Sequence, residues 1–383
     1  MEKSDISYDL VYLTGCGLRQ QPPDPSYVRT MDLKALYAQS RNASLSALVC
    51  MALETMEGGF AGELADLWIE DKNKVIRKNL LMDLDRQALC EDLEEMGCWY
   101  LPLKGSLLKD LYPRMGMRQM ADNDILFDRS FRNAVTQWFL DRDYEAVSVG
   151  ESNHDVYEKP PFYNFEMHVD LFSSYYNEKW PEYFENIAQR LLPLPGTDFG
   201  RAMTDEDFYL FFLAHGYKHY AAGGTGLRTL CDERVWLRAK ESAMDWDILG
   251  SRLKELGLTG FEEDLRLLAH RVFDGEFRPE ALTDRQQEIL RYLLGSGTYG
   301  NWENQVTNAW NAARQEDGSR PRYLRYLWQR LFPGRDFYAQ LPDREALLKS
   351  PWKRCCYNTK RLWKALLSKK RQIGRELRII FHK

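Results

Sequence analysis

The residues best suited to chemistry are two aspartates, Asp122 and Asp124, which open the apolar run ILF. Side chains at i and i+2 lie on the same face of a β-strand, and a rise of about 3.3 Å per residue places the two Cα atoms roughly 6 to 7 Å apart. Carboxylates held this close repel each other unless a cation neutralises them. Oxygen ligands suit Mg²⁺ or Mn²⁺. A solvent-exposed strand end would show the same pair of aspartates. The motif alone therefore does not distinguish a metal site from an exposed strand end.

A third carboxylate is available on the segment from Asn164 to Phe172, which alternates strictly and is the clearest strand in the chain. Glu166, His168 and Asp170 share its polar face. If this strand lies beside the aspartates, Glu166 or Asp170 could bind the metal or accept the proton of an attacking hydroxyl. An antiparallel strand with one exposed face would show the same alternation.

Two further features could bind an anion. Lys104-Gly105-Ser106 lies between an expected strand and an expected helix, where glycine lets the backbone approach a phosphate and the helix N-terminus attracts negative charge. A plain turn with Ser106 as N-cap is the alternative. Arg118 could hold the β- and γ-phosphates of a nucleotide, or it could pair with Asp122 or Asp124 in a structural salt bridge.

The elements that must position these residues form a pattern of alternating strands and helices. Strands are expected at residues 98–103, 121–127, near 144–148 and at 164–172, with helices at 106–112 and 129–143. This order predicts a mixed sheet with packed helices, in an α+β fold flanked by N- and C-terminal helical regions. The expected divisions are residues 1–95 (helical), 96–195 (α/β core), 196–340 (helical domain) and 341–383 (basic helical tail).

The composition predicts a folded cytoplasmic protein. Of the 383 residues, 44% are hydrophobic and 13% aromatic, enough for a sizeable core. No apolar run approaches the roughly 20 residues that span a bilayer, so no membrane insertion is expected, and the N-terminus lacks the layout of a signal peptide. The seven cysteines form no CxxC pair, which indicates reduced thiols without a zinc site.

The C-terminal tail differs in charge from the rest of the chain. Residues 351–383 hold 11 Lys or Arg and a single acid, Glu376, although the whole chain has a net charge of −5. Such a tail could meet RNA, a membrane surface or an acidic partner, or it could dock on its own acidic protein. Docking is favoured because apolar residues interleave the charges: Trp352, Leu362, Trp363, Leu366 and Leu367.

The run LPLKGSLLKDLYPRMGMRQMADNDILF resembles the signature of the polymerase-beta-like nucleotidyltransferases, in which Gly-Ser and a helix precede Asp-x-Asp on a strand. More narrowly, it is similar to a largely uncharacterised bacterial branch of that superfamily. FEMHVDLF resembles the branch's Glu-x-His strand, HGYKHYAAGGTGLRTLCDERVWL its later helical segment, and QRLFPGRDF its C-terminal region. Fifteen residues separate Ser106 from Asp122, a longer spacing than is common in the superfamily but one that suits the branch.

The resemblance implies metal-dependent transfer of a nucleoside monophosphate from a nucleoside triphosphate, with ATP the expected donor, to an acceptor hydroxyl. It implies Asp122, Asp124 and Glu166 as ligands of one or two Mg²⁺ ions, with Glu166 preferred over Asp170. Lys104, Gly105, Ser106 and Arg118 would contact the nucleotide. A substrate cleft would include residues of the later strand and helices: His168, Asp170, Lys218, His219, Arg228 and Asp232. The acceptor, whether small molecule, protein or RNA, is left open.

Other readings of the same residues also remain. Arg228 and Asp232, one helical turn apart, could simply form a salt bridge. His215 and His219 share a helix face but show no third zinc ligand in the sequence. The fold could also serve as a non-catalytic nucleotide- or protein-binding module. A nucleotide-modifying toxin or its partner is a further possibility, because that role depends on the acceptor.

Overall fold

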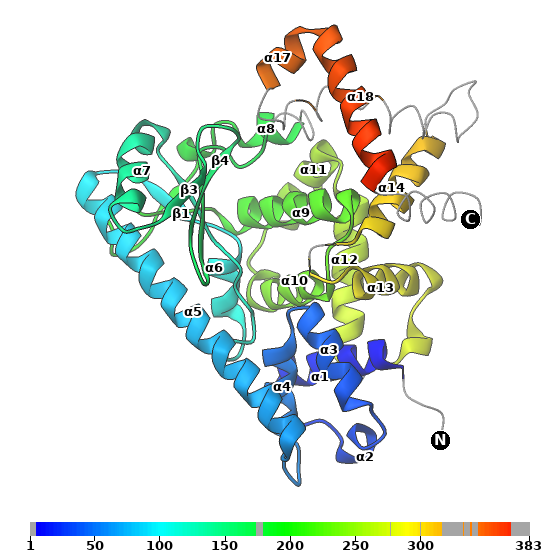
Figure 1. Ribbon diagram of the computed structural model, residues 1–383. Coiled ribbons are helices and arrows are strands. Elements are labelled where there is room, and N and C mark those ends of the chain that lie inside the picture. The colour runs from blue at the N-terminus through cyan, green and yellow to red at the C-terminus, as the bar shows by residue number, and fades with distance from the viewer. Residues whose placement is uncertain are drawn as a thin grey trace.

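The structure is a computed structural model that describes residues 5–173, 179–275, 277–298, 300–315, 332, 338 and 344–368. Helices surround one five-stranded mixed sheet (Figure 1), which confirms the predicted α+β class. In Figure 1, α5 (Glu63–Met96) and α7 (Arg132–Leu140) lie on one side of the sheet. Helices α9 (Asp205–Ala222) and α10 (Leu227–Lys240) lie on the other. The sheet is therefore covered on both faces, and the candidate residues lie on the face turned towards α9.

The order of the strands places segments far apart in sequence side by side. The five strands are β1 (Tyr100–Pro102), β2 (Asn123–Phe127), β3 (Glu145–Ser148), β4 (His154–Lys159) and β5 (Tyr163–His168). They run in the order β1-β2-β5-β4-β3. Only β2 and β5 pair in parallel, and the other neighbours are antiparallel. The central pair β2–β5 is thus the pair that carries the two candidate motifs.

Alternation along β2 and β5 divides the sheet into an apolar face and a polar face. Ile125, Phe127, Phe165 and Met167 are buried against α7 (Arg132–Leu140) and the C-terminal half of α5 (Glu63–Met96). Burial of such side chains stabilises the fold by about 1.5–3 kcal/mol each. Because the side-chain period of a strand is two, the residues between them face the other way, and these include Asp124 and Glu166.

The helices before and after the sheet share one apolar core. That core extends from Leu10 to Leu293 and includes residues of the N-terminal helices, of β2 and of α9 to α13. Every residue of α4 is buried, as expected for a helix that is apolar on all sides. The N-terminal helices are α1 (Ile6–Arg19), α2 (Pro25–Val28), α3 (Leu33–Asn42), α4 (Ser46–Leu53) and α5.

The later helices form the wall opposite the sheet. They are α9 (Asp205–Ala222), α10 (Leu227–Lys240), α11 (Trp246–Leu256), α12 (Thr259–Phe273), α13 (Asp284–Ser296) and α14 (Trp302–Gln315). Shorter elements are α6 (Gly105–Leu108), α8 (Lys179–Phe184), the 3-10 turns at Lys109–Leu111, Arg129–Phe131, Ile187–Gln189 and Pro279–Ala281, and the hairpin of β6 (Leu192–Pro193) with β7 (Arg201–Ala202). No helix within the described ranges is both long and apolar enough to cross a bilayer.

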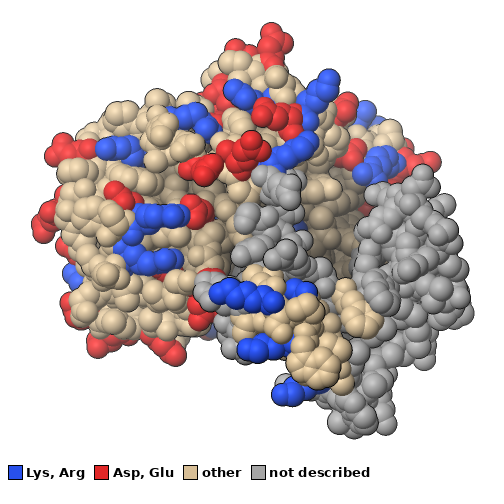
Figure 2. Space-filling view, turned by 90° about the horizontal axis from the view of Figure 1, so that it is seen from above, with Lys and Arg blue, Asp and Glu red and all other residues tan. Residues whose placement is uncertain are grey.

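The described part of the basic tail forms α17 (Arg344–Lys349) and α18 (Pro351–Ser368), which stand out from the body in Figure 1. The expectation that Trp352 docks on the protein is wrong, because 76% of this residue is exposed. The side chains of Leu362, Trp363, Leu366 and Leu367, residues 369–383 and most of QRLFPGRDF lie outside the described residues. In Figure 2, basic and acidic side chains alternate over the described surface facing the viewer, without one continuous basic area there.

Candidate functional site

Parallel pairing of β2 with β5 brings the two acidic motifs together. Asp124 is the direct neighbour of Glu166 across the pair, which confirms that the two strands lie side by side. Asp122 precedes β2 by one residue and is half-buried. Asp124 is buried, while Glu166 remains partly accessible. The sheet register thus places three carboxylates on one face, where the sequence predicted them.

Lys104 supplies a positive charge at this cluster. Its Nζ donates to Oδ1 of Asp124 at 2.6 Å and lies 3.9 Å from Oε2 of Glu166. The backbone N–H of Leu103 donates to the carbonyl of Asp124 at 2.9 Å, so the chain is held against β2 just ahead of Lys104. Lys104 itself adopts φ 48° and ψ −116°, a conformation that costs a non-glycine residue about 1–3 kcal/mol and is concentrated at functional sites.

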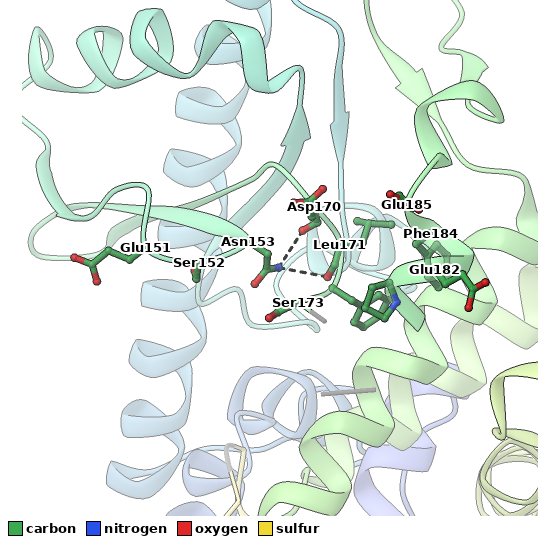
Figure 3. A pocket seen from close by; sticks show the side chains of 11 residues that line it. Glu151, Ser152, Asn153, Asp170, Leu171, Ser173, Glu182, Phe184 and Glu185 are labelled. Atoms are coloured by element: carbon green, nitrogen blue, oxygen red, sulfur yellow. Dashed lines mark hydrogen bonds between the residues drawn. The ribbon is translucent and has the colours of Figure 1, made fainter. Parts of the chain in front are cut away.

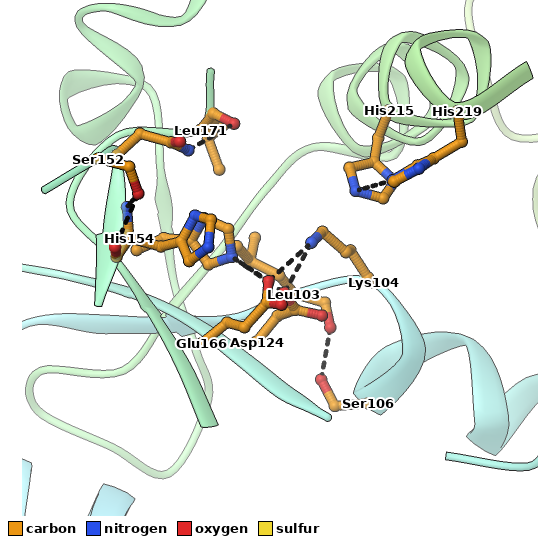
Figure 4. Close-up of polar contacts among 12 residues, drawn as sticks. Leu103, Lys104, Ser106, Asp124, Ser152, His154, Glu166, Leu171, His215 and His219 are labelled. Atoms are coloured by element: carbon orange, nitrogen blue, oxygen red, sulfur yellow. Dashed lines mark hydrogen bonds and ion pairs between the residues drawn. The ribbon is translucent and has the colours of Figure 1, made fainter. Parts of the chain in front are cut away.

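Two histidines complete the cluster. His168 Nε2 lies 2.9 Å from Oδ1 of Asp124 and 3.6 Å from Oε2 of Glu166. His154 lies directly opposite His168 on β4, with 5.0 Å between the ring centroids. Figure 4 shows His154 on one side of Glu166 and Asp124, with Lys104 approaching from the other side.

Burial and charge shift the acidity of these groups in different directions. Burial and the neighbouring carboxylates Asp124 and Glu166 raise the pKa of Asp122 to about 6. Burial also disfavours the charged form of Asp124, but Lys104 and the hydrogen bond with His168 outweigh it and hold its pKa far below the usual range. The pKa of Glu166 is lowered because the adjacent His168, 3.6 Å away, and the charge of Lys104 oppose the effect of burial. Within one cluster, the pKa of Asp122 is thus raised, whereas the pKa values of Asp124 and Glu166 are lowered.

The tightest set of potential metal ligands is not the predicted set. Within the described ranges, one group of three has its ligand atoms within 4.8 Å of one another, and it consists of His154, Glu166 and His168. Asp122 and Asp124 are not part of that group. His154 was missed in the sequence because the segment before residue 164 was read as a polar loop. A hairpin reading of HDVYEK and NFEMH, joined by a short Pro-Pro turn, would have placed it opposite His168.

Arg118 is engaged elsewhere than expected. Its Nε and Nη2 donate to the two carboxylate oxygens of Asp232 at 2.8 and 3.0 Å, and both residues are buried. The hydroxyl of Tyr112 also donates to Asp232, at 2.7 Å. The alternative in which Arg118 pairs with Asp122 or Asp124 is therefore not the one found, and neither is the alternative bridge between Arg228 and Asp232. Arg228 instead donates to the backbone carbonyl of Gln119 at 3.1 Å.

In the Lys104-Gly105-Ser106 segment, Lys104 and Gly105 line the cavity described below, whereas Ser106 caps a turn. The hydroxyl of Ser106 is buried and donates to the carbonyl of Leu103 at 2.7 Å, and Ser106 is not among the residues that line the cavity described below. Helix α6 has only four residues, too few to build a strong helix dipole. The alternative of a plain turn and cap thus describes Ser106 better than the expected phosphate contact.

A cavity of about 390 Å³ opens between the polar face of the sheet and helices α9 and α10. Lys104, Asp122, Asp124 and Glu166 line its sheet side. Its other lining residues include His154, His168, Phe208, Phe211, Phe212, His215, Lys218, His219, Thr225, Arg228 and Thr298. The cavity joins the carboxylates to all of the α9 and α10 residues that the resemblance assigned to a substrate cleft, and a site between packed elements is where small ligands commonly bind.

Two histidines of α9 face the carboxylates across the cavity (Figure 4). The Nε2 atoms of His215 and His219 lie 3.2 Å apart, as the i,i+4 spacing allows. Burial, together with the charges of Lys218 and Lys104, lowers the pKa of His219 to about 4. Burial and the charge of Lys104 also hold the pKa of His215 well below its usual value. Both imidazoles are therefore neutral near pH 7.

Asp170 lies away from the cluster. Strand β5 ends at His168 rather than continuing to Phe172, and the carboxylate of Asp170 accepts from Arg129 Nη2 at 2.6 Å at an exposed position. Asp170 lines a separate cavity of about 570 Å³, shown in Figure 3 with Asn153 donating to the carbonyl of Asp170. Of the two candidates for the third carboxylate, only Glu166 is next to Asp124.

Helix α5, which the sequence did not connect with the site, holds the aspartate segment in place. The side chain of Asn79 donates to the carbonyl of Arg118 at 2.8 Å and accepts from the N–H of Met120 at 3.2 Å. Asn123, between the two aspartates, donates to the carbonyl of Met82 at 3.0 Å. Since these amides are fully buried, α5 fixes the backbone from residue 118 to residue 123.

Comparison with known proteins adds one finding. A family model described as "Uncharacterised nucleotidyltransferase" matches residues 29–274, which is more than half of the chain. The matched range contains the sheet, both motifs and all lining residues of the cavity except Thr298. No curated protein and no solved structure matches the chain.

Proposed function

The chain belongs to this family of uncharacterised nucleotidyltransferases, and we propose that it transfers a nucleoside monophosphate from a nucleoside triphosphate to an acceptor hydroxyl. Pyrophosphate is the second product, and ATP is the donor that the resemblance favours. The observation that carries the proposal is the register of β2 and β5, which places Asp124 beside Glu166 at the floor of a cavity. The acceptor is a small molecule, a protein or an RNA.

The donor set fits a divalent cation. Asp122, Asp124 and Glu166 would hold Mg²⁺ or Mn²⁺, since hard cations prefer carboxylate oxygens. The raised pKa of Asp122 supports this assignment, because burial and two like charges destabilise its ionised form and a bound cation would reverse that effect. When bound, such ions neutralise the charge that develops on the attacking and leaving oxygens.

Cationic side chains of the cavity would bind the triphosphate. Lys104 is salt-bridged to Asp124, and a cation on that carboxylate would compete with the ammonium for the same oxygen. Lys104 would then turn to the phosphates, for which a lysine is a suitable point charge. Lys218 and Arg228 line the opposite wall and supply further positive charge. Arg118 has a supporting part, since its guanidinium is occupied by Asp232.

The acceptor hydroxyl needs a base and a dry site. Glu166 is suited to accept its proton, because its lowered pKa keeps the carboxylate ionised near pH 7. Phe208, Phe211 and Phe212 form an apolar part of the lining, which limits competing hydrolysis by water. The neutral imidazoles of His215 and His219 lie across the cavity and could orient the acceptor through hydrogen bonds.

A non-catalytic binding module is the second candidate, and one observation favours it. Oδ1 of Asp124 already receives hydrogen bonds from Lys104 and His168, so this buried carboxylate is satisfied without a metal. In that case Asp124 would stabilise the fold, and the cavity would bind a nucleotide or another ligand without turnover.

Incubation with α-³²P-labelled nucleotides, Mg²⁺ or Mn²⁺ and cell lysate tests the proposal. We expect label to move to an acceptor with wild type, and not with Asp122→Asn or Glu166→Gln. Asp170→Asn is the matched control, because this residue lies outside the cavity, and we expect it to label as wild type does. If nucleotide raises the melting temperature of wild type without labelling any acceptor, the binding module is the better description. Equal labelling by wild type and Asp122→Asn would refute the assigned site.

A further inference from the structure

We propose that His154, Glu166 and His168 form a binding site for one transition-metal ion of the Mn²⁺ or Zn²⁺ type on the hairpin of β4 and β5. The inference concerns which metal ion the cavity selects. It rests on the proposed function at one point, because Glu166 belongs both to this site and to the proposed transfer site. The site itself can be measured without any nucleotide.

Strand geometry brings the three ligands together. His154 and His168 are direct partners across the antiparallel pair β4–β5, and Glu166 precedes His168 by two residues, on the same face of β5. Their ligand atoms lie within 4.8 Å of one another, a separation that one ion with bonds of about 2.0–2.2 Å can bridge after small side-chain movements. All three line the cavity.

The chemistry of the set favours a transition metal. Two imidazole nitrogens with one carboxylate are a usual three-ligand set for a zinc site that keeps an open position. Imidazole also suits other divalent transition metals, whereas Mg²⁺ takes oxygen ligands and retains its waters. An ion held here would have its remaining positions turned towards the cavity, where a phosphate or a water could bind.

Unsatisfied nitrogens support a ligand at this place. The Nδ1 atoms of His154 and His168 are both buried and have no hydrogen-bond partner within the described part of the chain. Buried polar atoms are normally paired, so leaving two adjacent imidazoles incompletely satisfied needs a reason. His168 also contacts Asp124 at 2.9 Å through Nε2, in the manner of the carboxylates that orient metal-bound histidines.

His154 is the residue that distinguishes a metal site from a purely structural cluster. His168 has a second explanation, because it also hydrogen-bonds Asp124. His154 has no hydrogen bond from its ring within the described residues and contacts His168 only by ring packing. A rival location for the metal is the pair His215–His219, but no third ligand joins that pair among the described residues.

The test measures binding of Zn²⁺, Mn²⁺ and Mg²⁺ to the nucleotide-free full chain, by competition with a chromophoric chelator for Zn²⁺ and by electron paramagnetic resonance for Mn²⁺. Wild type should bind one Zn²⁺ or Mn²⁺ more tightly than Mg²⁺. His154→Gln should weaken that binding at least about tenfold, a loss at the lower end of that seen even for residues supporting metal ligands. His270→Gln is the matched control, since His270 pairs with Asp274 and Glu241 outside the cavity, and it should bind as wild type does.

Two results would overturn the site. One is unchanged affinity in a folded His154→Gln variant, with the fold checked by circular dichroism. The other is a loss in His219→Gln equal to that in His154→Gln, which would place the ion at the α9 pair. Asp122→Asn keeps the comparison independent of catalysis, because it should bind Zn²⁺ but not transfer a nucleotide. Metal binding without transfer in wild type would remove the proposed function and leave this inference standing.

Discussion

A Cβ atom added to Gly105 would lie 2.3 Å from Nη1 of Arg118. Ordinarily an arginine end would move aside, but this guanidinium is buried and held by both oxygens of Asp232. The close approach of Arg118 is therefore enough to require glycine at position 105. The turn at Lys104 and Gly105 and the buried pair of Arg118 with Asp232 can therefore form only together, because each occupies the space beside the other.

We expect Gly105→Ala to lower the free energy of unfolding by about 1–3 kcal/mol, the usual cost of overpacking. Urea denaturation measures it. Gly250→Ala is the control, because Gly250 lies in helix α11 with no atom within 4 Å of an added Cβ. Alanine is a better helix former than glycine by about 0.5–1 kcal/mol, so the control should gain stability. Similar values for the two variants would contradict the contact with Arg118.

Breaking the buried pair should cost more than removing one hydrogen bond. We expect Asp232→Ala to destabilise by about 3–5 kcal/mol, because Arg118 is left as a buried, unpaired charge. Tyr112→Phe removes only the hydroxyl that donates to Asp232 and should cost about 0.5–1.5 kcal/mol. Denaturant titration of both variants tests the ranking. If Asp232→Ala keeps wild-type stability, the pair with Asp232 does not hold Arg118 in place. Arg118 would then be free to bind a ligand, and the supporting role proposed for it would be wrong.

Lys104→Met should make the protein depend on added cations. The substitution removes the ammonium from Asp124 and Glu166, so the buried carboxylates repel each other without compensation. Mg²⁺ or Mn²⁺ should then raise the melting temperature more in this variant than in wild type, since ligands that bind the native state stabilise it. Lys74→Met, at the exposed pair with Glu70, should respond to the metal as wild type does. An equal response in all three proteins would show that no cation binds at these carboxylates.

Because of Glu233, we expect the free energy of unfolding to fall as the pH rises. Burial and the charge of Glu262 raise its pKa to about 8, although Tyr209 donates to it at 2.6 Å. A carboxyl whose pKa is higher in the folded state than in the unfolded state favours folding below the unfolded pKa, and this contribution is lost as pH rises through the folded value. The loss, on the order of 5 kcal/mol, should fall between pH ~4.5 and ~8.

Glu233→Gln should remove that slope, because an amide does not ionise. From pH 5 to pH 8, the urea concentration at which wild type unfolds should fall relative to that of the variant, because other titrating groups such as Asp122 and His219 are common to both proteins. Glu255→Gln is the control, at an exposed pair with Arg252, and should follow wild type. A slope that persists in Glu233→Gln would assign the effect to another group.

Trp352→Ala tests the position of the tail. Because 76% of Trp352 is exposed, we expect stability to change by no more than about 0.5 kcal/mol, as for other surface substitutions. Thermal or urea unfolding of the full chain measures this. A loss above about 2 kcal/mol, comparable with truncation of a core side chain, would show that the tryptophan is docked on the body after all.

The sequence by itself determined the class of fold and the strands that carry the acidic residues. Strict alternation in NFEMH and the apolar run after Asp124 were enough, because a half-buried strand needs that period. The parallel pairing that makes Asp124 and Glu166 neighbours was only a condition in the sequence, and the structure decided it. The end of β5 did not, since Val169 and Leu171 continue the alternation past His168, where the strand stops.

Only the tertiary structure decided which charges meet. Arg118 pairs with Asp232, 114 residues away in sequence, and Asn79 of α5 fixes the loop before the aspartates. His154 joins the site because β4 folds back on β5. The sequence does not show which of several acidic residues an arginine will pair with. That partner is set by packing between distant elements, because burial makes an unpaired charge costly. Spacing along the chain reveals the period of a strand or helix, but it does not reveal which charged residues become partners.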